Sequence, residues 1–337
     1  MASVPHGPIS GNPGHAQPSG VPDCGVLVLA YGHRRYQSQA QSLALSLQRH
    51  SPGIHRTLVT DDVQGPATQA YDSVIQVETG QPDDCGLKLN LDTYAPYPRT
   101  LYIDADVLAV RPIDLLFDIF DGSDVGLVGR DISSAQEERW YGDVASMCRI
   151  AGTDWLPKFN SGLLLIRTTE VTRQVFSRAR EFAHEYNRLG LHPFRGGIAD
   201  EPLLAMALAG QGIHAQDLTA VAAATPIGIN GPLRVNALAG QCAFTKQGLE
   251  VEPVLIHFAA DYSSDYRLAG AHYRRERLAL RLSQCLGAPD SAARIAAGLR
   301  YGVQCAAFNT WIRVAGRAPR DPSGIFGTAK QPFEVPQ

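Results

Sequence analysis

Short apolar segments alternate with segments of helical periodicity in the first half of this 337-residue chain, and this alternation is its strongest constraint on fold. Gly25–Gly32 is an apolar run that ends in a turn, which is typical of a buried strand. Leu43 and Leu47 then repeat at helical spacing, before Ser-Pro-Gly at 51–53 ends the helix. Two more apolar runs, at 56–62 and 72–79, follow. The pattern predicts an α/β protein with a mainly parallel mixed sheet flanked by helices.

The apolar stretch Thr100–Val110 contains two acids, Asp104 and Asp106. In an extended strand, residues two apart project to the same face, so we expect both carboxylates to point together. Two like charges this close repel in a partly buried site, and a divalent cation relieves that repulsion. The alternative is that the strand ends at Asp104 and both acids are solvated turn residues. The apolar residues that follow at once, Val107–Val110, favour a metal site.

The later segments predict further elements and one main domain. We expect a short helix at 86–94, helices at 111–120, 168–190 and 200–210, and strands at 124–131, 159–167 and 252–261. Asp200 is a plausible N-cap, and Gly190 a helix end. Residues 1–23 are rich in Pro, Gly and Ser, which predicts a disordered tail. We therefore divide the chain into that tail, a domain over 24–285 and a helical appendage with a loose tail over 286–337.

Composition and charge exclude several classes of protein. Hydrophobic residues make up 45% of the chain, enough for a globular core, and no apolar run is long enough to span a bilayer. Lys plus Arg number 30 against 33 Asp plus Glu, which gives no reason to expect a nucleic-acid partner. The six cysteines are scattered, and no basic residue precedes Arg34. These features predict a cytoplasmic protein with reduced thiols and no signal peptide.

Four segments in a fixed order carry a resemblance to a known family. In the nucleotide-sugar glycosyltransferases of the GT-A fold, and most closely in glycosyltransferase family 8 and its relatives, similar segments occur in the same order. The segments are LKLNLDTYAPYPRTLYIDADVLAVRPIDLLF from Leu87, FNSGLLLI from Phe159, DEPLLAMAL from Asp200 and VLIHF from Val254. The resemblance spans about two thirds of the chain. It implies the nucleotide-diphospho-sugar transferase fold and hexosyltransferase-like activity.

The resemblance also implies roles for individual residues. Asp104, Asp106 and His257 would bind Mn²⁺ or Mg²⁺. Asp200 and Glu201 would lie beside the anomeric carbon as catalytic residues. The residues that would contact the nucleotide-sugar are Ala30, Tyr31, Asp61 or its neighbour Asp62, Lys88, Asp104, Asn160, Ser161 and Gly162.

Each of these roles has a structural alternative. His257 could be a hydrogen-bonded structural histidine, Asp200 only an N-cap, and Lys88 an exposed helix lysine. Asn160 could satisfy backbone groups at a strand start, and Tyr31 could belong to the core.

The sequence also departs from the family pattern in two places. The segment HFAADYSSDYR from His257 lacks the late glycine of the family pattern and the lysine that grips the diphosphate there. Arg267 could replace that lysine, but it stands at a different spacing. Asp-Glu-Pro at 200–202 replaces the usual Asp-Gln-Asp. The sequence therefore assigns no group to the diphosphate, and it fixes neither the sugar nor the anomeric outcome.

Three functions remain open on these residues. The first is a metal-dependent transferase that uses a UDP-sugar, with retention, and a glycan, lipid or small-molecule acceptor. The second is a sugar nucleotidyltransferase, which needs a Gly-rich basic loop after the first strand, where only one glycine stands in AYGHRRY. The third is a nucleotide-sugar or glycan-binding relative without catalysis. Arg130–Trp155 is expected to be a flexible lid or acceptor loop.

The C-terminal segment 291–320 contains five arginines and no acid. Its apolar residues repeat every four positions, at Ile295, Leu299, Val303, Ala307 and Trp311. One interpretation is a basic amphipathic helix on an anionic membrane, which would make the protein membrane-peripheral. The other is a terminal helix that packs on the catalytic domain with its arginines in water.

Overall fold

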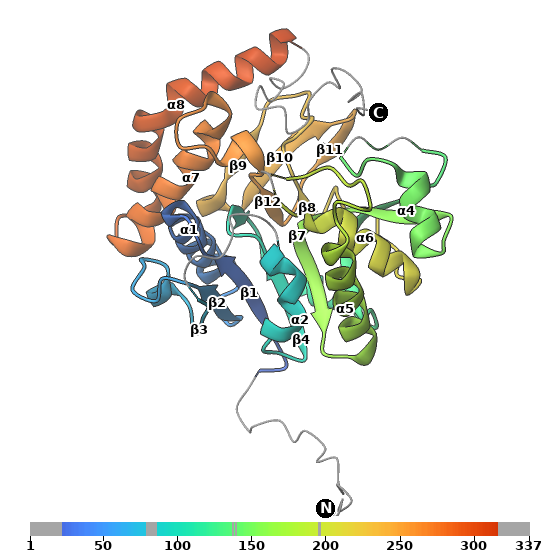
Figure 1. Ribbon diagram of the computed structural model, residues 1–337. Coiled ribbons are helices and arrows are strands. Elements are labelled where there is room, and N and C mark those ends of the chain that lie inside the picture. Colours follow the sequence, from blue (N-terminus) through green and yellow to red (C-terminus); the bar gives the residue numbers. More distant parts are fainter. Residues whose placement is uncertain (1–21, 79–85, 137, 139, 195–196, 316–337) are drawn as a thin grey trace, which may run out of the picture.

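The computed structural model describes residues 22–78, 86–136, 138, 140–194 and 197–315. A six-stranded sheet of order β3-β2-β1-β4-β7-β6 forms its centre (Figure 1). β3, β2, β1 and β4 pair in parallel, whereas β7 is antiparallel to both β4 and β6. The predicted mixed, mainly parallel sheet flanked by helices is therefore confirmed. Its strands are β1 Cys24–Ala30, β2 His55–Thr60, β3 Ser73–Gln76, β4 Arg99–Ile103, β6 Val125–Ser133 and β7 Trp155–Arg167.

Both faces of β1 are buried, which explains why this strand is apolar at successive positions. Leu27 and Leu29 join a core cluster with side chains of α5 and α6. Val26 and Val28, on the opposite face, join a cluster with side chains of α1 and α3. A strand covered on both sides has no solvent-facing positions and therefore no polar alternation. The helices are α1 Arg34–His50, α2 Leu91–Tyr94, α3 Asp114–Ile119, α4 Val144–Ala151, α5 Glu170–His184, α6 Asp200–Gly210, α7 Ala271–Leu280 and α8 Asp290–Ala315.

Two smaller sheets lie beside the main one, with strand orders β5-β12-β8 and β11-β10-β9. The chain leaves the main sheet after β4 and enters the second sheet at β5, so residues 104–106 join the two sheets. β12 pairs antiparallel with β5, and His257 lies opposite Val107. This pairing brings a residue from late in the chain beside Asp104 and Asp106. The strands are β5 Val107–Ala109, β8 Ala223–Ala224, β9 Arg234–Asn236, β10 Gln241–Lys246, β11 Leu249–Val251 and β12 Leu255–His257.

Three local predictions were wrong. α5 ends at His184 rather than at Gly190, because Tyr186 turns away and its hydroxyl donates to the carbonyl of His192 at 2.6 Å and accepts from the amide of Ala199 at 3.1 Å. Asp200 is the first residue of α6 and not its N-cap, a position that Ala199 occupies. The segment 130–155 is not one loop, since it contains the end of β6 and α4.

The domain division stays a prediction. Residues 1–21 and 316–337, which include most of the two predicted tails, lie outside the described residues. The proposed boundary at 285 falls between a π-helical turn, Arg281–Cys285, and α8. Among the described residues, no helix has both the length and the hydropathy needed to cross a bilayer.

Candidate functional site

A turn between β4 and β5 carries the two aspartates. The amide of Val107 donates to the carbonyl of Asp104 at 3.1 Å, which closes the turn. The amide of Asp104 donates to Gly162 of β7, and the carbonyl of Asp106 accepts from Phe258 just after β12, each at 3.0 Å. Strand alternation was therefore the wrong reason for the convergence of the carboxylates. A turn fastened to two neighbouring strands brings them together.

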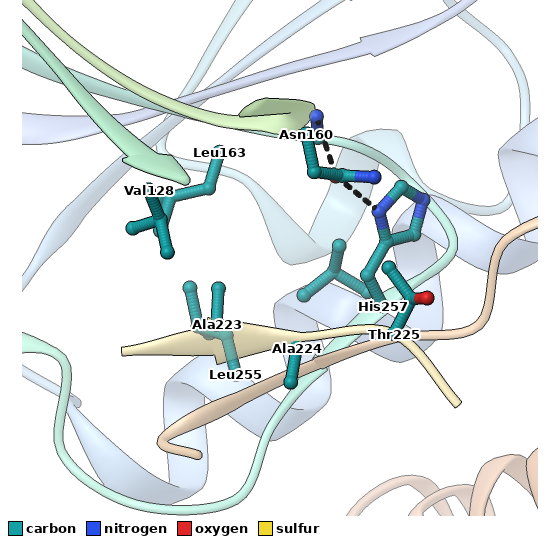
Figure 2. Close-up of a pocket in the computed structure, with 10 residues that line it drawn as sticks. Val128, Asn160, Leu163, Ala223, Ala224, Thr225, Leu255 and His257 are labelled. Atoms are coloured by element: carbon teal, nitrogen blue, oxygen red, sulfur yellow. Dashed lines mark hydrogen bonds between the residues drawn. The ribbon is translucent and has the colours of Figure 1, made fainter. Parts of the chain in front are cut away.

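His257, at the end of β12, points one ring nitrogen at both aspartates. Its Nε2 lies 2.9 Å from Asp106 Oδ1 and 3.7 Å from Asp104 Oδ2. Its Nδ1 lies 2.7 Å from Asn160 Oδ1, and Figure 2 shows this contact between β7 and β12. In the protonated ring both nitrogens donate, Nδ1 to the amide oxygen of Asn160 and Nε2 to Asp106. A cation bound at Nε2 would replace that proton while Nδ1 still donates to Asn160. Asn160 therefore orients the histidine.

Electrostatics couple His257 to the two carboxylates. Burial by itself lowers the pKa of His257, but the negative charges of Asp106 and Asp104 outweigh burial and leave the pKa raised. Burial also acts to raise the pKa of Asp106, and the neighbouring His257 outweighs it, so that this pKa is lowered. Each group thus favours the charged form of the other.

The cluster Asp104, Asp106 and His257 fits a divalent cation. One ligand atom from each residue lies within 4.8 Å of the other two. Two carboxylate oxygens and an imidazole nitrogen suit Mn²⁺, and carboxylates with water suit Mg²⁺. The hydrogen bond from His257 Nδ1 to Asn160 leaves Nε2 for the cation and fixes the orientation of the ring, as is usual for metal-bound histidines.

Gly162 is required by the close packing of this cluster. A Cβ built at this position would lie 2.4 Å from His257 Nδ1 and 2.7 Å from Asn160 Oδ1. Both distances are shorter than any normal contact, so a side chain here would displace the ring. The amide of Gly162 also donates to Asn160 Oδ1 at 3.0 Å. The glycine of Asn-Ser-Gly therefore belongs to the support of the histidine rather than to the cavity wall.

Lys88 reaches the site from a 3-10 helix, Gly86–Asn90. Its Nζ lies 2.8 Å from Asp104 Oδ1, 3.3 Å from Ser161 Oγ and 3.6 Å from Asp200 Oδ2. The hydroxyl of Tyr102 also donates to Asp104. Lys88 is thus no exposed helix lysine, and it links the aspartate turn to the acids of α6.

Asp200 and Glu201, at the start of α6, have different surroundings. Glu201 accepts from Trp140 Nε1 at 2.7 Å and from the amide of Ser161 at 3.1 Å. Asp200 is only 3% exposed, and its Oδ2 accepts no hydrogen bond from the described residues. The 3.6 Å separation from Lys88 Nζ is an ion pair that is too long for a hydrogen bond. A buried acceptor without a donor is costly, so Asp200 is suited to receive a ligand hydroxyl.

A cavity of about 850 Å³ joins most of the predicted site residues. It is large enough for a nucleotide-sized ligand. The predicted residues on its wall are Tyr31, Lys88, Asp104, Asp106, Asn160, Ser161, Asp200, Glu201 and His257.

Three predicted contacts do not line this cavity. Ala30 is 1% exposed within the core, and Gly162 packs behind the ring of His257. Asp61 accepts from the amide of Gly32 at 3.0 Å and so shapes the loop after β1. The neighbouring Asp62 accepts from the amide of Gln64 at 3.2 Å. The nucleotide contact predicted for these residues therefore has no support in their positions.

A second, much smaller cavity lies behind His257 (Figure 2). Its volume is about 20 Å³, room for one water molecule. Its other walls are mostly apolar and include Val128, Leu163 and Leu255. This space separates β12 from β7 and is too small for a substrate.

Lys246 is a cavity residue that sequence reasoning missed. Its Nζ donates to the carbonyl of Thr225 at 3.0 Å, and within the described residues no carboxylate lies at ion-pair distance from it. Burial lowers its pKa to about 8. Thr225 follows β8, which runs parallel to β12, so it lies level with His257 (Figure 2). An ordinary lysine at the end of a strand gives no signal in a single sequence, and only the pairing of β8 and β12 reveals this position.

Comparisons with known proteins give structural likenesses only. No family model matches the chain, and no curated protein matches it by sequence. Solved structures that match include the glycosyltransferase GlyE of Streptococcus pneumoniae TIGR4, with 17% identity over 59% of this chain and a TM-score of 0.40. This chain covers 46% of GlyE, less than half of its length.

Two further solved structures match to a similar extent. The galactosyltransferase LgtC, in complex with donor and acceptor sugar analogues, is 16% identical over 59% of this chain and 75% of its own, with a TM-score of 0.40. Mouse xyloside xylosyltransferase 1 is 16% identical over 60% of this chain and 87% of its own, also with a TM-score of 0.40. All three are described as glycosyltransferases of one kind or another. Likenesses of this extent decide neither substrate nor reaction.

Proposed function

We propose that this protein is a metal-dependent glycosyltransferase that takes a sugar from a nucleotide-diphosphate donor, UDP-sugar, with retention of configuration. The observation that carries the proposal is the convergence of Asp104, Asp106 and His257 on the wall of a large cavity. Half-buried carboxylates that face a histidine nitrogen and an open cavity suit a cation shared with a phosphate ligand. The order of the sequence motifs supports the nucleotide-sugar class.

In this proposal the cluster would hold Mn²⁺ or Mg²⁺ through Asp104, Asp106 and His257. When bound, the ion supplies Lewis-acid neutralisation of the departing diphosphate. Asn160 keeps the ring of His257 in its binding orientation, and Lys88 holds Asp104 in place at 2.8 Å. These contacts preorganise the site before the donor arrives.

Asp200 would face the sugar of the donor. Positive charge grows on the ring carbon as the bond to the diphosphate breaks, and a fixed carboxylate beside it lowers the barrier. The buried Oδ2 without a donor is placed to accept a sugar hydroxyl or to stabilise that charge. Glu201 serves differently, since its bonds to Trp140 and Ser161 position the cavity wall.

The acceptor would bind near Trp140 and Phe194. These rings meet edge to face, with centroids 5.6 Å apart, and both line the cavity. Aromatic faces offer flat apolar surface to a sugar or a similar acceptor, while Glu138 and Arg130 on the same wall offer polar contacts. A glycan, a lipid-linked sugar or a small hydroxylated molecule would fit this chemistry.

Titration of UDP into the purified protein tests the proposal directly. We expect calorimetric binding of UDP in the presence of Mn²⁺, and its loss in EDTA, because the acids repel the diphosphate without a cation. Absence of UDP binding in both buffers would overturn the UDP-sugar assignment. If UDP does bind, hydrolysis of UDP-sugar by the metal-loaded protein distinguishes a transferase from a binding protein without catalysis.

A sugar nucleotidyltransferase is less well supported by the loop after β1. Such an enzyme needs free backbone amides there to hold a triphosphate. The amide of Gly32, the one glycine of this loop, instead donates to Asp61 at 3.0 Å.

Lys246 is the group that we propose for the unassigned diphosphate contact. It lines the same cavity, it has no carboxylate partner among the described residues, and the strand pairing places it near His257. Lysine has three donors, and the carbonyl of Thr225 takes one of them. A phosphate oxygen would supply the missing negative charge.

Lys246→Met is expected to lower the affinity for UDP about tenfold or more, since charged hydrogen bonds of this kind contribute about 1.5–3 kcal/mol. Affinity for uridine, which has no phosphate, should stay unchanged, and Lys246→Arg should retain part of the UDP affinity. Calorimetry with both ligands measures the difference. An equal loss for UDP and uridine would instead indicate a structural role for the lysine.

A further inference from the structure

α8 (Asp290–Ala315) packs on the protein through a stripe different from the one that the sequence suggested. Its buried side chains are Ala293, Ala297, Cys305, Phe308 and Ile312. All of them except Cys305 join side chains of α7 and of the second and third sheets in one core cluster. The predicted repeat of Ile295, Leu299 and Val303 is not part of that contact. The helix therefore does pack as a terminal helix, but it does so with its other side.

The opposite side of α8 is apolar and exposed to solvent. Ile295 is 63% exposed, and Leu299 and Val303 are each 83% exposed. At 100° per residue, these positions fall within one third of the helix circumference. The residues on this side, which we call the outer face, are Ala292, Ile295, Ala296, Leu299, Val303, Ala306, Ala307, Thr310 and Val314, all of them exposed. Single exposed apolar residues are normal, but a continuous apolar face marks a contact surface.

Positive charge borders the outer face on both sides. The same helical spacing places Arg313 at one edge and Arg300 at the other, and both side chains are exposed. Trp311, 42% exposed, lies on the side of Arg300. No acidic residue occurs between Ser291 and Ala315. A long apolar stripe between arginines, with a tryptophan at its border, is the pattern of a helix that lies in a membrane interface.

We infer that the outer face of α8 binds the surface of an anionic lipid bilayer, with the helix lying in the plane of the membrane. Figure 1 shows α8 at the outer edge of the molecule, beyond α7 and away from the main sheet. Its 26 residues extend about 39 Å, so the whole stripe can contact a flat surface.

Charge complementarity favours lipid over a second copy of the chain. Anionic headgroups can pair with Arg300 and Arg313 while the acyl region receives the leucine and valine side chains. Two copies of α8 packed through the same face would bring arginines together with no acid on either outer face to offset them. This inference does not depend on the proposed transferase activity.

Sedimentation of the full chain with vesicles tests the inference. We expect binding to phosphatidylcholine vesicles that contain phosphatidylglycerol, weaker binding at high salt, and little binding to phosphatidylcholine alone. Leu299→Glu with Val303→Glu should reduce binding about tenfold or more for each side chain withheld from the membrane. Because both residues are exposed, thermal unfolding of this variant should match that of the wild type. Ile150→Glu, which changes an exposed apolar residue of α4, is the matched control and should bind normally.

Two results would overturn the inference. The first is no binding of the wild type to anionic vesicles, and the second is undiminished binding by the double variant. If vesicle binding is absent, light scattering identifies the occupant: a dimer that the double variant abolishes would make it a second copy of the chain.

Discussion

Asp106→Ala is expected to abolish metal-dependent binding of UDP, with a loss of affinity of about 100-fold or more. Changes to groups that merely support a metal ligand cost about 10- to 100-fold, and removal of a ligand should cost at least as much. The remaining aspartate cannot compensate, because Asp104 already accepts from Lys88 at 2.8 Å and from Tyr102. His257 would also lose the carboxylate that lies 2.9 Å from its Nε2. Calorimetry with UDP and Mn²⁺ measures the loss.

A second acid on the same cavity wall provides the control for this prediction. Asp217 lines the cavity but is not part of the metal cluster, so Asp217→Ala should bind UDP and Mn²⁺ as the wild type does. Equal losses in both variants would point to the overall negative charge of the cavity rather than to a metal site. Undiminished Mn²⁺-dependent binding by Asp106→Ala would refute the proposed ligand set.

The fold was predictable because burial leaves a direct mark on sequence. β1 is covered by helices on both faces, so its residues are apolar without alternation, and the next segment must be a helix that returns the chain to the sheet edge. The same reasoning located the aspartates, since acids inside an apolar segment need a functional explanation. The same reasoning predicted an extended strand through Asp104 and Asp106, where the structure has a turn. A segment of three residues between apolar strands does not reveal from its composition whether it is a turn or a strand.

The parts of the site that could not be predicted depend on contacts between distant segments. Asn160 and His257 are 97 positions apart and meet only because β12 pairs with β5 beside β7. Lys246 depends in the same way on the pairing of β8 with β12. In α8 the periodicity correctly indicated a helix, but two apolar stripes compete on it. Which of them is buried depends on α7, so the sequence of α8 alone cannot decide.

Asp200→Asn is expected to lower the rate of sugar transfer about 100-fold or more while leaving the affinity for UDP almost unchanged. The amide keeps the size of the side chain but removes the charge that would stabilise the reacting sugar, and losses of this order accompany removal of one preorganised electrostatic group. UDP lacks the sugar that is transferred, and Asp200 does not belong to the metal cluster, so UDP binding should not depend on this charge. Transfer or hydrolysis of UDP-sugar, measured beside UDP calorimetry, gives the two numbers.

Glu201→Gln is the control that distinguishes the electrostatic role of Asp200 from a role in positioning the cavity wall. Trp140 and Ser161 donate to different oxygens of Glu201, and glutamine keeps only one of these two acceptors. Glu201→Gln should therefore loosen the cavity wall, but lower turnover less than Asp200→Asn does. If both variants lowered turnover equally, we would conclude that Asp200 and Glu201 act together to hold the start of α6 in place. A normal rate in Asp200→Asn would move the catalytic charge elsewhere in the cavity. A matched loss of UDP affinity would instead place Asp200 in the nucleotide site through Lys88, which lies 3.6 Å from it and 2.8 Å from Asp104.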